Sequence, residues 1–104
     1  MNKFDERKKS FENKFAKDQE LQFKVSAKRN KYLAVWASLK LGKNDEQRQN
    51  YVQEVVKADL KEAGDEDVFR KVKKDFENSA INIDDSEIRN QMLLALERAK
   101  KDFQ

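Results

Sequence analysis

Histidine, cysteine and proline are absent from the 104 residues, and glycine occurs only at Gly42 and Gly64. Without cysteine the chain has no disulfide, no thiolate nucleophile and no cysteine-based metal site. Without histidine it lacks the usual general base and the commonest transition-metal ligand. Two glycines are too few for a phosphate-binding loop of the Walker or dinucleotide type. We therefore expect a binding protein without catalytic residues, without a metal and without a tightly bound cofactor.

The chain also lacks a long apolar segment. Its longest apolar run, around residues 32–39, is too short to cross a bilayer, and the first ten residues, MNKFDERKKS, contain no apolar signal sequence. These features predict a protein that stays in the reducing cytoplasm and does not insert into a membrane.

Charged residues make up 41% of the sequence and hydrophobic residues 38%, which lies near the polar limit for a folded domain. Seven Phe, two Tyr and one Trp supply enough apolar area for one modest core. The charge is unevenly distributed, because residues 1–31 hold ten Lys or Arg against five Asp or Glu, whereas residues 32–104 hold 13 against 15. The electropositive first third suits an acidic partner surface.

Hydrophobic spacing predicts a long helix over residues 21–41, ending at Gly42, where a left-handed stop is expected. Two adjacent apolar stripes cover most of its circumference, so this helix should be the most buried one. The stripes are Leu21, Val25, Tyr32, Trp36, Leu39 and Phe23, Ala27, Ala34, Ala37, Leu41.

Three further helices are predicted: from Asn44 or Asp45 to about Ala63, from Asp65 to about residue 78, and over residues 84–103. The last begins with Asp84 and Glu87 at capping-box spacing, and Ile83 and Ile88 are placed for a hydrophobic staple. Short connections between four helices favour a small all-α, antiparallel four-helix bundle over residues 18–104.

Residues 1–17 form a separate segment, in which Phe4, Phe11 and Phe15 lie on one helical stripe among charged side chains. A helix this short is marginal in water unless its stripe finds a surface. It can be a mobile docking segment that orders in a partner's groove, or it can extend the next helix and pack on the bundle. Asp18 can cap a new helix, which favours a break near Lys17. Spacing alone does not decide between these two readings.

Two charged clusters have alternative interpretations. Glu62, Asp65, Glu66 and Asp67 lack the spacing of a calcium loop, and helix capping explains them better. The basic residues Lys28, Arg29 and Lys31 lie beside Tyr32 and Trp36. Nucleic-acid binding through them is less favoured than a solvated helix face, because the patch is short and the rest of the chain is acidic. Similarly, Asp59 beside a valine-rich face is expected at an edge rather than in a buried ion pair.

The order of several segments resembles the zeta subunit family of F-type ATP synthases from alphaproteobacteria, an ATPase inhibitor family. The resemblance covers nearly the whole chain, and its combined pattern is specific although each piece alone is weak. The loop after Gly42 and the abundance of Lys and Asn depart from the family pattern. The segments that carry the resemblance are FDERKKSFENKFAKDQELQFK (4–24), RNKYLAVWAS (29–38), LGK (41–43), EVVKADLKEAGDEDVFRKV (54–72) and IR (88–89).

The resemblance implies a helical bundle on the catalytic head of the ATP synthase, peripheral to the inner membrane. The N-terminal segment would insert at a catalytic interface between the alpha and beta subunits, reach toward the gamma subunit and block ATP hydrolysis. It also implies weak ATP or ADP binding, for which only bases such as Lys28, Arg29 and Lys31 could serve. The inhibitory residues implied are Phe4, Asp5, Arg7, Lys8, Phe11, Glu12, Lys14 and Phe15.

Overall fold

The computed structural model describes residues 3–59 and 65–104, with side chains from Glu6 onward. The regular structure in these residues is entirely helical, which confirms the predicted all-α class. The long helix α2 contacts every other helix of this set and is the centre of the fold. The helices are α1 (Lys3–Lys17), α2 (Gln19–Lys40), α3 (Asp45–Ala58), α4 (Glu66–Asn78) and α5 (Asp85–Asp102).

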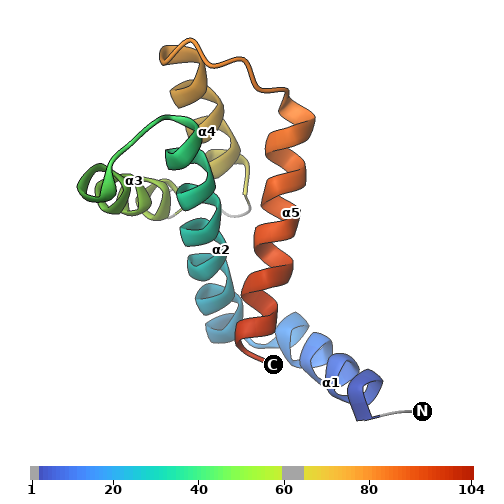
Figure 1. The fold of residues 1–104 in the computed structure, drawn as a ribbon. Helices are drawn as coiled ribbons and strands as arrows, with labels where there is room; N and C mark the ends of the chain where they lie inside the picture. The colour runs from blue at the N-terminus through green and yellow to red at the C-terminus, as the bar shows by residue number, and fades with distance from the viewer. Residues whose placement is uncertain (1–2, 60–64) are drawn as a thin grey trace.

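The helices are not arranged as a regular bundle. Figure 1 shows α2 and α5 side by side and antiparallel, whereas α3 lies across α2 and α1 extends away from the far end of the pair. The two residues that α3 buries, Tyr51 and Val55, are one turn apart, so its contact with α2 is short and suits a steep crossing. The antiparallel four-helix bundle predicted from short connections is therefore realised only in the α2 and α5 pair.

Three helix boundaries follow the predicted signals. Asp18 caps α2 by accepting a 3.1 Å hydrogen bond from the Leu21 amide, and this confirms the break near Lys17. Gly42 takes the left-handed conformation, with φ 73°, directly after α2. The amide of Lys43 then donates to the Ser38 carbonyl at 3.0 Å, a Schellman closure of the helix end.

Other boundaries differ from prediction. The capping box is present at Asn44 and Gln47, whereas Asp84 occupies the N-cap of α5 without a side-chain hydrogen bond, so the box predicted there is wrong. Asp65 likewise precedes α4 without a capping bond from its side chain. Helix α3 ends at Ala58, and its predicted continuation to Ala63 and the stop at Gly64 fall largely outside the described residues.

Helices α2 to α5 enclose what we call the main core, to which Ile83 and Ile88 both contribute, as the predicted staple requires. Helix α2 is less enclosed than its two stripes predicted, because Phe23 is 63% exposed and Leu39 59% exposed. Four helices cannot cover the whole circumference of a fifth when one of them crosses it steeply. The buried residues of the main core are Leu33, Ala34, Ala37, Tyr51, Val55, Val68, Phe69, Val72, Phe76, Ile88, Met92 and Ala95.

Candidate functional site

A second, smaller cluster lies where α1 meets the beginning of α2 and the end of α5. Its buried members are Phe11, Leu21, Val25 and Ala99, and we call it the end cluster. Phe11 is only 7% exposed, and its ring stacks on that of Phe15 with centroids 6.2 Å apart. The aromatic stripe of the N-terminal segment therefore covers the end of the α2 and α5 pair.

Polar contacts fix the same position of α1. The Lys100 ammonium lies 3.4 Å from the Glu12 carboxylate and 4.8 Å from the centre of the Phe15 ring. The Gln22 side-chain amide donates a 2.7 Å hydrogen bond to the Phe15 carbonyl near the end of α1. Helix α1 is thus held by one buried phenylalanine, one ion pair and one hydrogen bond near its C-terminal end.

The remaining predicted head residues fall into two groups. Arg7, Lys8 and Lys14 are exposed, and the first and last of them line an open hollow together with Phe103. The side chains of Phe4 and Asp5 lie outside the described residues. The structure brings Phe11, Glu12 and Phe15 to the bundle, and it leaves the basic side chains of the same helix facing solvent.

The three bases predicted as a surface patch do not share one surface. Arg29 is only 7% exposed, and its guanidinium donates to the Asn30 side-chain oxygen at 3.1 and 2.9 Å and reaches Asp59 at 3.4 Å. The Asn30 amide also donates to Asp59, at 2.9 Å. The predicted solvated face at Arg29 and the edge position of Asp59 are therefore wrong. The two side chains form a largely buried ion pair between α2 and the end of α3.

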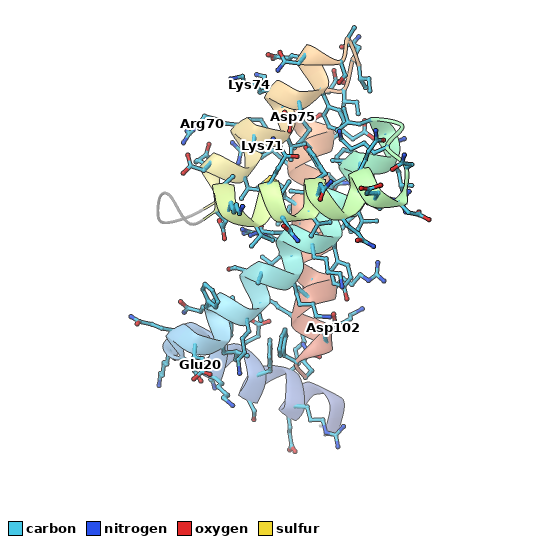
Figure 2. All side chains as sticks on the ribbon, turned by 90° about the vertical axis from the view of Figure 1, so that its left-hand side faces the viewer. Glu20, Arg70, Lys71, Lys74, Asp75 and Asp102 are labelled. Atoms are coloured by element: carbon cyan, nitrogen blue, oxygen red, sulfur yellow. The ribbon has the colours of Figure 1, made fainter. Side chains whose placement is uncertain are left out.

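Lys28 and Lys31 are accessible. The Lys28 ammonium lies 3.8 Å from Asp102, which Figure 2 labels near the end of α5, and it also approaches the Tyr32 ring. The Tyr32 hydroxyl donates to the same carboxylate, and this hydrogen bond raises the pKa of the phenol. Asp102 is thus engaged by two groups of α2, whereas Lys31 points to solvent.

Sequence reasoning missed a polar cluster between α3 and α4. Lys71 bridges Glu54 at 3.2 Å and Asp75 at 2.8 Å, both visible around α4 in Figure 2. Tyr51 is buried beneath Lys71 and Lys43, and burial, followed by the nearby Asp75 carboxylate, raises its pKa. These residues are far apart in sequence and no spacing connects them. They fasten α3 to α4 and show no reactive geometry.

Within residues 3–59 and 65–104, no group of three or more carboxylates is placed to hold a metal ion. In the same residues no helix is long and apolar enough to cross a membrane. What the described surface offers is a charged amphipathic helix resting on the end of a helical domain.

Comparison with known protein families matches residues 1–102 to the ATPase inhibitor subunit zeta. The chain belongs to this family. A structure titled "Solution NMR structure of the protein" is 38% identical to this zeta-family chain, with a TM-score of 0.71. The similarity covers 80% of this chain and 94% of that one. A search of curated proteins found no match. The zeta family is one of inhibitor subunits, so this chain is assigned a role in inhibiting an ATPase.

Proposed function

We propose that this protein blocks ATP hydrolysis by inserting α1 at a catalytic interface between the alpha and beta subunits of the ATP synthase, reaching toward gamma. The zeta family assignment supports an inhibitory role on that enzyme. The electropositive head, with its aromatic stripe, supports α1 as the inserting element. Such a partner would hold the protein at the cytoplasmic face of the inner membrane.

The observation that carries the proposal is the construction of α1. It is a helix of its own, separated from α2 by Asp18, whose backbone is extended at φ −102° and ψ 104°. A change at this one junction can reorient α1 without disturbing the main core, to which α1 contributes no buried residue. Its exposed bases, Arg7, Lys8 and Lys14, supply positive charge for an acidic surface.

The same aromatic side chains cannot contact the bundle and the enzyme at once. Phe11 is buried in the end cluster, and Phe15 packs beside it. Insertion of α1 as an inhibitory helix therefore requires Phe11 to leave Leu21, Val25 and Ala99. Only a few contacts hold it, so the enzyme interface can replace them at small cost.

A double replacement of the stripe tests which surface inhibits. Phe11→Asp with Phe15→Asp should weaken inhibition at least about 100-fold, since each interfacial Phe contributes roughly 1.5–3 kcal/mol and each Asp adds a desolvation cost. The matched control is Phe23→Asp, which changes an exposed Phe of α2. Inhibition of ATP hydrolysis is measured for both, with helicity and melting as checks on the fold. Equal inhibition by the double variant and the parent would eliminate the stripe as the contact.

A cross-link tests whether α1 must move. Because the chain has no cysteine, Glu12→Cys with Lys100→Cys creates two unique thiols on either side of the ion pair. A short, reducible bifunctional reagent should join α1 to α5 and remove inhibition, and reduction should restore it. The uncross-linked double variant controls for loss of the ion pair. Full inhibition by the cross-linked protein would mean that α1 acts in the position seen here.

The alternatives predicted from the basic patch, nucleotide sensing and nucleic-acid association, gain no support. Arg29 is buried and engaged with Asn30 and Asp59, and Lys28 approaches Asp102. One accessible Lys31 is too little charge for a phosphate backbone or a nucleotide.

A further inference from the structure

Exposed leucines mark two opposite faces of the α2 and α5 pair, and one of these faces forms a groove. Leu39 of α2 and Leu94 of α5 are 59% and 55% exposed and line this groove. Trp36, partly buried, and Ala95 also line it, and the Trp36 ring packs edge-on against Phe76 at 5.6 Å. The groove is therefore apolar, built on rigid helices and open to solvent.

The charge around this groove has one sign. Arg98 is the one charged residue that lines it, and its guanidinium lies 4.1 Å from the centre of the Tyr32 ring, at the groove's end. Lys31, one helical turn before the groove residue Val35, is exposed. Asp102, the nearby carboxylate on α5, is taken up by Tyr32 and Lys28. A partner segment would meet apolar side chains beside cations.

We propose that this groove binds an amphipathic helix of the catalytic head whose apolar residues are flanked by Asp or Glu, a proposal that rests on the function proposed above. Such a helix would cover Leu39, Leu94 and Trp36 with its apolar face and place carboxylates near Arg98. A second copy of this chain fits less well, because a two-fold contact would bring the same basic groove ends toward each other. The groove is then an anchor, independent of the α1 contact.

Two adjacent leucines provide the variant and its control. Leu94 lies in the groove, whereas Leu93, 62% exposed, lies on the opposite face beside Met92 and Leu96. Glutamate at either position keeps a good helix former on a solvated site, so both variants should fold. The full chain carrying Leu94→Glu should bind the purified catalytic head at least about tenfold more weakly than the parent. Leu93→Glu should bind like the parent, and both should melt normally.

A further pair of measurements separates apolar from charge contributions. Leu94→Lys removes the apolar contact but keeps the positive sign, so it should bind more tightly than Leu94→Glu and more weakly than the parent. Binding of the parent should weaken as salt rises. Parent-like binding by Leu94→Glu, or equal losses at positions 93 and 94, would overturn the groove proposal alone. No binding of the parent to the head would overturn the proposed function as well.

Self-association is measured in parallel. Sedimentation equilibrium of the parent should give a monomer over the concentrations used for binding. A dimer that Leu94→Glu converts to a monomer would show that the groove holds a second copy, and would overturn the proposal.

Discussion

Phe76 and Phe11 are both buried phenylalanines, but their surroundings differ in kind. Phe76 lies in the main core, where residues from α2, α3, α4 and α5 surround it. Phe11 lies in the end cluster, on the rim of the molecule, with three buried neighbours from α2 and α5. A residue enclosed by four helices cannot be exposed without unfolding the domain, whereas α1 can open alone. The comparison separates the part that maintains the fold from the part that is free to act.

Truncation of the main core should have the largest effect. Phe76→Ala removes a ring that is 2% exposed, and it should lower the free energy of unfolding by about 3–5 kcal/mol through lost burial and a cavity. Urea denaturation followed by circular dichroism measures this change. If Phe11→Ala cost as much as Phe76→Ala, the two regions would be one cooperative unit.

Loss of the buried counter-charge should rank second. Asp59→Asn keeps the side-chain shape but leaves the Arg29 guanidinium without its anion, at a cost of about 2–3 kcal/mol, because Asp59 is not fully buried. The control is Asp85→Asn, which breaks an exposed 3.1 Å ion pair with Lys73 and should cost less than about 1 kcal/mol. Similar urea midpoints for the two variants would mean that burial adds nothing to the Arg29 and Asp59 pair.

Truncation in the end cluster should have a small effect on global stability. Phe11→Ala should change the free energy of unfolding by less than about 1 kcal/mol, since α1 opens before the domain unfolds. For the same reason, backbone amides before Lys17 should exchange with solvent faster than those in the middle of α2 and α5. Hydrogen exchange followed by NMR measures this directly. Equal protection of α1 and α2 would remove the distinction between the two regions.

Change of pH should have the smallest effect of all. Inhibition should stay nearly constant from about pH 6 to 8, because the chain has no histidine. The hydrogen bond from Arg89 lowers the pKa of Glu66, so its contribution to folding is lost only on stronger acidification. Burial raises the pKa of Tyr51, so its contribution is lost only in alkali. Inhibitory strength is assayed against pH at fixed ionic strength, corrected for the enzyme's own profile. A steep rise on acidification that disappears when residues 65–67 are neutralised would contradict this expectation.

Local signals in the sequence predicted the helices well. The stop at Gly42, the break at Asp18 and the end of α4 near Asn78 each depend on a few neighbouring residues. The predicted separation of residues 1–17 also corresponds to a separate helix. Such features are decided within one or two turns, so one sequence contains them.

Features that depend on the packing of distant segments were not predictable in the same way. Arg29 reads as a surface base until Asp59, thirty residues later, is brought against it. Phe23 and Leu39 read as core until the steep crossing of α3 leaves them exposed. The end cluster, likewise, depends on Ala99 and Lys100 arriving beside α1 from the other end of the chain.

The docked position of Phe11 also has a thermodynamic consequence for potency. Only molecules with α1 released are competent to bind, so the apparent dissociation constant is the intrinsic one divided by the released fraction. If about one molecule in ten is released, the apparent affinity is roughly tenfold weaker than the intrinsic affinity. Substitutions at Lys100, Leu21 or Val25 would then tune inhibition over a wide range without altering any residue of α1. The end cluster thereby sets how much inhibitor is needed, while α1 determines where it binds.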